Sequence, residues 1–289
     1  MLLLVIVSLI WAFSFGLIAT YLRGVDTAVV SAARLGLALL VFLPLLRWRG
    51  LRARTAMALT GIGALQFGVM YLLYIQSFRY LQAHEAALFT ITTPIIVTLF
   101  ADALDRTWRQ RALLAAVLAV LGAIPVTWSS KNISVTLTGI ALIQLSNAAF
   151  GVGQVLYKRL RVANPALRDR DIFALPYAGG FAIALAMIAT RDVSLALTAT
   201  QAWTLVYLGV LASGLGFFLW NVGATQVSAG TLAVMNNAKV PLGVTCSLLF
   251  FGGQANIVWL LISLGVMGAA VWLAREDQKT QKTRKTAKT

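Results

Sequence analysis

Lys239 is a charged residue in a stretch where a membrane would not tolerate charge. It lies about twelve residues from either end of the apolar stretch at residues 228–251, roughly 18 Å along a helix and beyond the reach of a lysine side chain to the membrane surface. A charge at the bilayer centre costs several kcal/mol and usually belongs to a functional site. We therefore predict that Lys239 contacts the substrate. The alternative is a structural lysine that donates to backbone carbonyls released by Pro241.

Arg34 is the second basic residue within an apolar stretch, about two turns inside residues 27–46. An inward-facing guanidinium could hold a substrate carboxylate through two parallel hydrogen bonds. An outward-facing one could instead snorkel toward the membrane surface, and the sequence leaves both readings open. Glu85 and Asp102 lie near the ends of their predicted helix, at residues 84–103. The pathway is therefore predicted to be electropositive, which favours anionic or zwitterionic solutes over organic cations.

Amide, hydroxyl and aromatic residues complete the predicted substrate cavity. They gather on several of the apolar stretches, where amides would meet polar groups and rings would form apolar walls. Such a cavity suits an amino acid with a bulky side chain. The alternative for any single amide is a hydrogen bond between helices. Besides the two cations, the predicted substrate-binding residues are Trp11, Tyr71, Tyr74, Thr90, Asn147, Gln154, Trp220, Asn221 and Asn237.

Signatures of enzymes and cofactor sites are missing from the sequence. It contains no H-E-x-x-H, G-x-S-x-G, C-x-x-C or phosphate-binding G-x-x-x-x-G-K-[ST] motif. Its one cysteine, Cys246, excludes a disulfide within the chain. No catalytic, metal or cofactor site is therefore predicted, and a solute transporter is favoured over a membrane-embedded enzyme or a passive channel. The expected partners are a small-molecule substrate and the lipid bilayer but no nucleic acid, and a monomer is expected, with a dimer as the alternative.

The elements that position these residues are predicted to be membrane-spanning helices. Of 289 residues, 60% are hydrophobic and 11% charged, with a mean hydropathy of +0.83, whereas soluble domains carry about 25% charged residues. Ten helices of about 20 residues each leave only short loops. We predict an all-α integral membrane protein with helices at residues 2–22, 27–46, 55–78, 84–103, 112–128, 135–157, 172–189, 202–223, 228–251 and 256–274.

The basic residues predict the orientation of these helices. Of the 24 Lys and Arg residues, 18 fall in the even-numbered loops and the C-terminal tail, and four (Arg23, Arg79, Lys131 and Arg191) in the odd-numbered loops. Basic residues near helix ends stay on the cytoplasmic side. Both termini are therefore predicted to be cytoplasmic, in a multi-pass protein of the inner (plasma) membrane. The basic tail at residues 276–289 is expected to be disordered, because it has almost no apolar residues to bury.

The two halves of the chain resemble each other weakly. Thr92-Thr93-Pro94 corresponds to Lys239-Val240-Pro241, and Tyr21 and Arg23 correspond to Tyr157 and Arg159 at an offset of 136. Five helices per half is an odd number, so the second repeat enters the membrane from the opposite face. Inverted repeats of this kind surround a central site in alternating-access transporters. The predicted units are residues 1–130 and 131–275, followed by the tail.

These motifs resemble those of a known family. The start of the first helix, Trp11-Ala12-Phe13-Ser14-Phe15, and the run Tyr80-Leu81-Gln82-Ala83 before Pro94 are similar to the EamA branch of the drug/metabolite transporter superfamily. An acidic residue usually follows the proline helix in each repeat. Asp102 and Asp105 occupy that region in the first half, whereas the second half has Gln254.

The resemblance implies a secondary transporter that exports small metabolites. Within the family the overall pattern is similar to the YddG-type exporters of amino acids, including aromatic ones. Other organic acids, amines or drugs are the alternative substrates. The sequence has no central carboxylate to carry a coupling proton or sodium ion, so facilitated efflux or exchange is expected.

Overall fold

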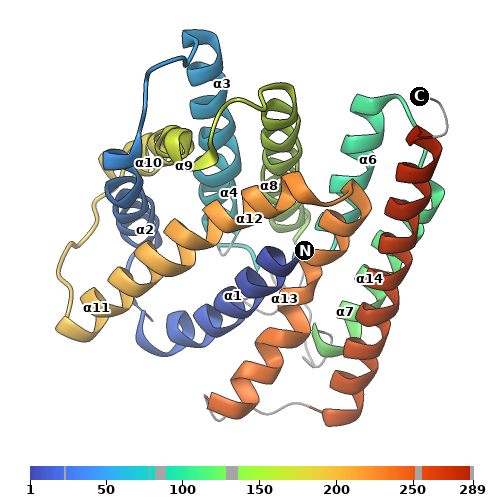
Figure 1. Ribbon diagram of the computed structural model, residues 1–289. Coiled ribbons are helices and arrows are strands. Elements are labelled where there is room, and N and C mark those ends of the chain that lie inside the picture. The colour runs from blue at the N-terminus through green and yellow to red at the C-terminus, as the bar shows by residue number, and fades with distance from the viewer. Residues whose placement is uncertain (23, 78, 82–88, 128–135, 251–255, 287–289) are drawn as a thin grey trace.

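The chain folds into a bundle of helices in the computed structural model, which describes residues 1–289 except 23, 78, 82–88, 128–135, 251–255 and 287–289 (Figure 1). Within the described residues every regular element is a helix, so the all-α prediction is confirmed at this level. The helices are α1 (Leu2–Tyr21), α2 (Thr27–Phe42), α3 (Ala53–Gly63), α4 (Met70–Ser77), α6 (Thr93–Asp105), α7 (Gln110–Thr127), α8 (Leu137–Ala163), α9 (Asp169–Ile172), α10 (Ala174–Ala189), α11 (Ala199–Tyr207), α12 (Gly216–Gln226), α13 (Ala229–Phe250) and α14 (Ile257–Thr286).

Several of these helices are long and apolar enough to cross a membrane. In the described part of the chain there are six such segments: Thr27–Leu45, Ala53–Tyr74, Leu137–Ala163, Asp169–Ala189, Ala199–Gln226 and Ile257–Arg275. Two shorter apolar helices, Leu2–Ser14 and Gln110–Ile124, add to them. The number of ten spans stays a prediction, in part because the expected helix at residues 84–103 begins outside the described residues.

Two helix pairs carry much of the packing. α7 and α14 lie side by side along most of their length, and α2 packs against α10 (Figure 1). α10 also approaches α3 at backbone distance, since a Cβ added at Gly179 would lie 2.0 Å from the carbonyl oxygen of Thr60. Small residues such as Gly179 permit the backbones of neighbouring helices to approach this closely.

Two long helices contain an interruption of the same kind. A π-helical stretch, η2 (Ala64–Val69), joins α3 to α4, and another, η3 (Leu208–Leu215), joins α11 to α12. π-stretches are rare, free some carbonyls from the regular hydrogen-bonding pattern, and occur often at functional sites. The interrupted helices are the third predicted helix of each half of the chain.

One predicted helix is broken rather than continuous. The expected helix at residues 84–103 is interrupted by a turn at Ile91 and Thr92, and α6 then starts at Thr93 with Pro94 in its first turn. Proline lacks an N–H group and clashes with the carbonyl four residues earlier, which here is that of Thr90. Pro241, at the corresponding position of the second half, lies inside the unbroken helix α13.

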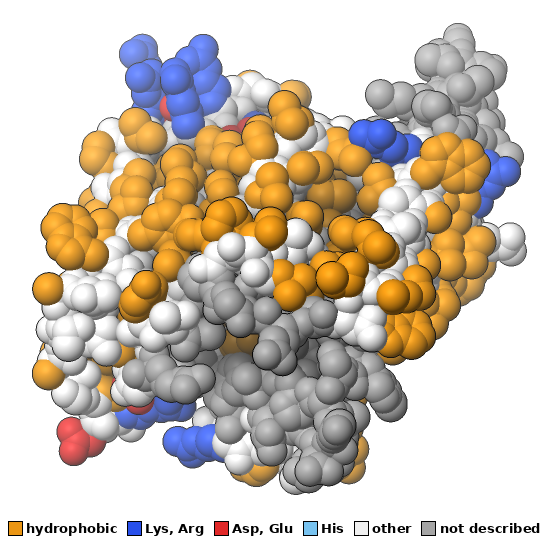
Figure 2. All heavy atoms as spheres, turned by 90° about the horizontal axis from the view of Figure 1, so that it is seen from below, with side chains coloured by type: hydrophobic (Ala, Val, Ile, Leu, Met, Phe, Trp, Pro, Cys, Tyr) orange, Lys and Arg blue, Asp and Glu red, His pale blue; other side chains and the backbone are white. Residues whose placement is uncertain are grey.

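The outer surface is largely apolar. Figure 2 shows one face on which hydrophobic side chains cover a broad area, with Lys and Arg at its margins. Large exposed side chains include Trp203 and Met57, at 73% and 69% exposure. Such a surface suits lipid chains rather than water. α14 extends to Thr286, into the basic tail for which the sequence predicts disorder, and the state of that tail stays a prediction.

Candidate functional site

Lys239 lies near the middle of α13 and points toward α1 and α8. Its Nζ lies 5.4 Å from the ring centroid of Trp11 and 5.6 Å from that of Phe150. No ion pair to Lys239 occurs within the described residues. Its side chain is partly exposed, whereas the three residues before it are buried. Lys239 is therefore a partly exposed cation that is stabilised by ring faces.

The alternative role predicted for Lys239 finds no support in its contacts. In the described part of the chain its ammonium donates no hydrogen bond to a carbonyl near Pro241; the carbonyl of Pro241 accepts instead from Thr245 Oγ1, at 2.9 Å. The ammonium has no acceptor among the described residues, so a ligand with a negative group would be its strongest partner.

Aromatic rings line the region beside Lys239. The Trp11 ring centroid lies 4.9 Å from that of Trp220 and 5.5 Å from that of Phe217. Phe217 stacks on Phe67 at 4.5 Å, which joins α12 to η2. Trp11 Nε1 donates to the carbonyl of Ala212 at 2.8 Å, so one of the η3 carbonyls receives a side-chain donor. The rings form an apolar wall in a defined orientation.

Gln154 connects three helices through hydrogen bonds, one of them to the ring of Trp220. Its Oε1 accepts from Trp220 Nε1 at 2.9 Å and from Asn236 Nδ2 at 3.3 Å, and its Nε2 donates to Asn236 Oδ1 at 3.2 Å. All three residues are buried. Gln154 and Trp220, both predicted to bind substrate, here satisfy each other and hold α8, α12 and α13 in register.

Arg34 faces inward and not toward the membrane surface, and its role toward substrate stays a prediction. It is 9% exposed, and its Nε donates to Ser213 Oγ in η3 at 2.9 Å. Its guanidinium carbon lies 5.4 Å from the ring centroid of Tyr71. The hydroxyl of Tyr177 donates to the carbonyls of Ser213 and Gly214, at 2.9 and 2.5 Å. Arg34 and Trp11 therefore both bind to the η3 stretch, at the neighbouring residues Ser213 and Ala212.

The predicted residues Asn147, Asn237 and Thr90 surround the break before α6. Asn147 Nδ2 donates to the carbonyl of Phe89 at 2.8 Å, and Asn237 Nδ2 donates to the carbonyl of Ile91 at 2.7 Å. The carbonyl of Thr90 accepts from Thr93 Oγ1 at 2.7 Å. These amides satisfy carbonyls that the broken helix leaves without an α-helical partner. Their role toward substrate stays a prediction.

The last two predicted residues lie in different surroundings. Tyr74 packs against Leu81 and Ile143. Asn221 Nδ2 donates to the carbonyl of Phe217 at 2.9 Å, while its Oδ1 has no hydrogen-bond partner among the described residues. The same holds for Nε2 of Gln66, in η2. One buried acceptor and one buried donor are thus available to a ligand or to water.

The carboxylates that form ion pairs in the described chain lie at the end of α6 and in α9, and none of them pairs with Lys239. Asp102, at the end of α6, accepts from Arg109 Nη1 at 2.6 Å, and Asp169 accepts from Arg161 Nε at 2.7 Å. Among the described residues no three His, Cys, Asp or Glu side chains are grouped as metal ligands. The central arrangement has the components for binding an anion with an apolar body.

Comparison with known proteins identifies the family. Residues 1–128 match the model of the EamA-like transporter family. The chain is 43% identical over 276 residues to a protein of Pseudomonas aeruginosa named probable biotin transporter, covering 94% of this chain and 96% of the relative. It is 40% identical to proteins named biotin transporter from Salmonella typhimurium and Escherichia coli K12, covering 96% of this chain and 93% of each relative. The chain belongs to the EamA-like transporter family.

As an EamA-like protein it is a multi-pass membrane transporter and not an enzyme, which confirms the predicted function class. A solved crystal structure matches with a TM-score of 0.79 and 16% identity, over 94% of this chain and 95% of that one, and supports the fold alone. The relatives described above are named biotin transporters, so their names do not support the predicted resemblance to amino acid exporters.

Sequence reasoning missed several residues of this EamA-like site. Ser213 and Tyr177 hold Arg34 and the η3 carbonyls, and Gln144 shares the carbonyl of Phe89 with Asn147, at 3.1 Å. A signal was present for Gln144, which lies three residues before Asn147 on the same helix face. Ser213 and Tyr177 had no comparable signal, because a lone hydroxyl in an apolar helix usually bonds within its own helix.

Proposed function

We propose that the protein carries biotin, or a small carboxylate of similar shape, across the inner membrane. The observation that carries this proposal is the Lys239 ammonium, which lies over the rings of Trp11 and Phe150 with no carboxylate paired to it in the described chain. An ammonium in an apolar, partly accessible site favours an anionic ligand. The full-length similarity to proteins named biotin transporter supports the choice among carboxylates.

The chemistry of biotin fits the groups in the central region. Its carboxylate would pair with Lys239, and its apolar chain and thioether ring would lie against the aromatic wall. Its ureido group has both N–H donors and a carbonyl acceptor. The buried Asn221 Oδ1 and Gln66 Nε2, which lack partners among the described residues, offer one acceptor and one donor of the matching kind.

Amino acids, including aromatic ones, are the second candidate. The aromatic wall favours a ring-bearing solute, as the narrower family resemblance does. A zwitterion also brings an ammonium group, which would lie close to Lys239 with no ion-paired carboxylate nearby in the described chain. Like-charge repulsion disfavours that arrangement, so a solute with a single negative charge ranks first.

We propose alternating access between two inverted five-helix repeats, at residues 1–130 and 131–275. The π-stretches η2 and η3 support this architecture, because they interrupt the third helix of each proposed repeat. Side chains from the first helix of each repeat also meet these stretches. Trp11 donates to Ala212 in η3, and Ser146 Oγ donates at 2.9 Å to the carbonyl of Met70, immediately after η2.

The proposed topology places both termini in the cytoplasm. Its basis is the distribution of Lys and Arg, with 18 on the proposed cytoplasmic side and four on the other. Reporter fusions at the C-terminal tail and in the loop at Lys131 test it. The expected result is a cytoplasmic tail and an extracytoplasmic Lys131 loop, and a tail found outside would overturn the topology.

Proteoliposomes that contain only this protein test the substrate. Radiolabelled biotin should enter or leave with saturable kinetics, and unlabelled biotin should compete. Biotin amide keeps the ring system but lacks the carboxylate, so it should compete at least roughly tenfold less well. Phenylalanine competing better than biotin would establish the second candidate instead.

The same vesicles resolve direction and coupling. The family resemblance predicts export, and flux measured with biotin loaded on either side determines which direction operates. Since no coupling carboxylate is expected near the centre, facilitated transport or exchange should dominate. Uphill flux under an imposed pH gradient, with biotin balanced on both sides, would overturn that expectation.

A further inference from the structure

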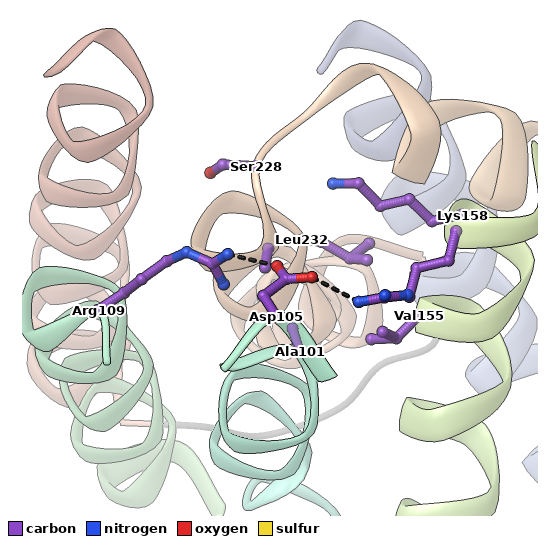
Figure 3. A pocket seen from close by; sticks show the side chains of 9 residues that line it. Ala101, Asp105, Arg109, Val155, Lys158, Ser228 and Leu232 are labelled. Atoms are coloured by element: carbon purple, nitrogen blue, oxygen red, sulfur yellow. Dashed lines mark hydrogen bonds and ion pairs between the residues drawn. The ribbon is translucent and has the colours of Figure 1, made fainter. Parts of the chain in front are cut away.

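A second charged region lies at the end of the bundle that the proposed topology makes cytoplasmic. A cavity of about 140 Å³ opens there between α6, α8 and the start of α13. We call it the Asp105 cleft, and Figure 3 shows Asp105 between Arg109 and the basic side chains of α8. Asp105 Oδ1 accepts from Arg159 Nη1 at 2.5 Å, and its other oxygen accepts from Arg109.

The cleft holds more positive than negative side chains. Arg109, Lys158 and Arg159 line it together with the single carboxylate of Asp105. Arg109 is also committed to the buried Asp102, through its Nη1 at 2.6 Å and its backbone N–H at 2.8 Å. Lys158 Nζ donates to the backbone carbonyl of Val227 and makes no ion pair within the described residues. Arg109 and Arg159 therefore share the carboxylate of Asp105, and Lys158 has no carboxylate partner among the described residues.

Asp105 is placed so that another carboxylate could replace it. The side chains of Asp105 and Arg159 are 39% and 47% exposed, whereas that of Asp102 is 4% exposed. Exposed ion pairs are weak because solvent screens them, so an incoming carboxylate can exchange with Asp105 at little cost. The Asp102–Arg109 pair would keep the end of α6 in place during the exchange.

The cleft is lined by two of the helices that hold the central residues, α8 and α13. Val155 and Leu232 line it, and they adjoin the central network: Val155 follows Gln154, and the carbonyl of Leu232 accepts from Asn236 at 2.8 Å. Lys239 lies seven residues beyond Leu232 on α13, about 10 Å along the helix axis. A substrate could thus pass its carboxylate between Lys239 and the cations of the cleft.

We infer that the Asp105 cleft is a second carboxylate site, which the substrate occupies on the cytoplasmic side of its path, and that Asp105 fills it as an internal ligand in the conformation described here. The inference rests on the proposed transport of a carboxylate. Arg159 and Lys158 would hold the visiting carboxylate, and Asp105 would compete with it. A network with a purely structural role would instead lose function whenever any one member is removed.

Binding of valerate, the side-chain acid of biotin, tests the site without reference to transport. The purified full-length protein is used with Lys239→Met as the background, so that the central cation does not contribute. Adding Asp105→Asn should lower the valerate concentration needed for half-maximal thermal stabilisation by roughly tenfold. Adding Arg159→Gln to that variant should abolish the gain, and pentylamine should stabilise none of the variants. Equal responses to valerate in all variants, or none in any, would overturn the inference.

Transport from each side of the membrane supplies a second, independent measurement. Asp105→Asn should lower the half-saturating biotin concentration on the cytoplasmic side by roughly threefold and leave the opposite side unchanged. Lys158→Met keeps the Asp105–Arg159 pair and should raise the cytoplasmic value, which keeps the inference testable if Asp105→Asn does not fold. The matched control is Arg170→Gln, at the same end of the bundle but outside the cleft. Equal changes on both sides, or no change in Lys158→Met, would contradict a cytoplasmic carboxylate site.

The two measurements separate this inference from the proposed function. If valerate behaves as expected but biotin is not carried, the cleft remains a carboxylate site and the choice of biotin is wrong. If biotin is carried but valerate does not distinguish the variants, the cleft inference is wrong and the proposed function stands.

Discussion

Cations at the centre of this protein and cations at the end of α6 meet different partners. Near α6, Arg109 lies 2.6 Å from the carboxylate of Asp102, whose side chain is 4% exposed. At the centre, Lys239 lies over two rings, and no carboxylate pairs with it in the described chain. Arg34 is also central and meets a hydroxyl and a ring. Within the described residues, Arg109 at the end of α6 therefore has carboxylate partners, whereas Lys239 and Arg34 at the centre have none.

This difference indicates which charged residues stabilise the fold and which are available to bind a ligand. A buried charge with its own counter-ion is stable in place and costs several kcal/mol to disrupt. A buried charge without one makes the empty site less stable and rewards a ligand that brings the opposite charge. Removing the Lys239 ammonium should therefore damage binding, whereas breaking the Asp102–Arg109 pair should damage folding.

Lys239→Met is expected to have the largest effect. It keeps most of the side-chain volume and removes the ammonium, so the carboxylate of the substrate would lose its partner. Truncating one member of a desolvated charge pair costs about 2–5 kcal/mol, which predicts at least a roughly 30-fold loss of biotin affinity. Vesicle transport, normalised to folded protein in the membrane, measures this.

Lys239→Arg and Arg111→Met are the matched variants for this test. Lys239→Arg should restore little, because a planar guanidinium does not replace a compact ammonium between two rings. Arg111→Met removes an exposed cation of α7 and should transport normally. Wild-type transport by well-expressed Lys239→Met would rule out Lys239 as a substrate contact.

Asp102→Asn should show the opposite pattern, with a loss of stability larger than the loss of transport per folded molecule. It removes the charge that holds Arg109 through a side-chain and a backbone hydrogen bond. The expected decrease in the free energy of unfolding is about 2 kcal/mol, since Arg109 is partly screened by solvent. Denaturant titration in detergent measures it. Full stability combined with lost biotin binding would reverse the roles assigned to the two regions.

Trp220→Phe should have a modest effect on the central region. The ring remains against Trp11, but Gln154 loses the indole donor at 2.9 Å. One neutral hydrogen bond contributes about 1 kcal/mol, so biotin affinity should fall by roughly two- to fivefold. Gln154→Leu, which leaves both Trp220 and Asn236 without their partner, should be worse. Equal effects of the two substitutions would argue against the Gln154 network.

Arg47→Gln is expected to have the smallest effect. Arg47 is 67% exposed and lies 4.0 Å from the carboxylate of Asp171. Pairs of this kind contribute less than about 0.5 kcal/mol. The midpoint of denaturant unfolding should stay within error of wild type. A clear destabilisation would mean that exposure is a poor guide to the function of ion pairs in this protein.

The sequence predicted the helical fold well because hydrophobic length is a strong signal. It placed helix ends less well where polar residues continue a helix. α8 runs to Ala163, beyond the predicted end at residue 157, because Arg161 is stabilised there by Asp169 and by the carbonyl of Asn164. α11 begins at Ala199, before the predicted start at residue 202, through a capping box formed by Thr198 and Gln201.

The candidate site was predictable only in part. Lys239 stood out because a charge in a long apolar stretch usually belongs to a functional site. The structure places it beside the rings of Trp11 and Phe150, and its role toward substrate stays a prediction. The roles of the amides depended on where carbonyls would be released. The break at Ile91–Thr92 and the stretch η3 release carbonyls that Asn147, Asn237 and Trp11 then satisfy. No periodicity in the sequence signals a π-stretch, so these partners could not be assigned in advance.

The stretch η3 also has a genetic consequence. A π-stretch holds one residue more than the α-helix it replaces, and each residue of an α-helix turns the chain by about 100°. Deleting a single codon within residues 208–215 would thus remove the extra residue and leave an α-helical turn, with Trp220 still facing Gln154. The same deletion at residues 216–219, in the regular helix α12, would instead rotate Trp220 by about 100° relative to the preceding helix. For this protein, loss of one residue is therefore expected to be tolerated better at η3 than in the α-helix that follows it.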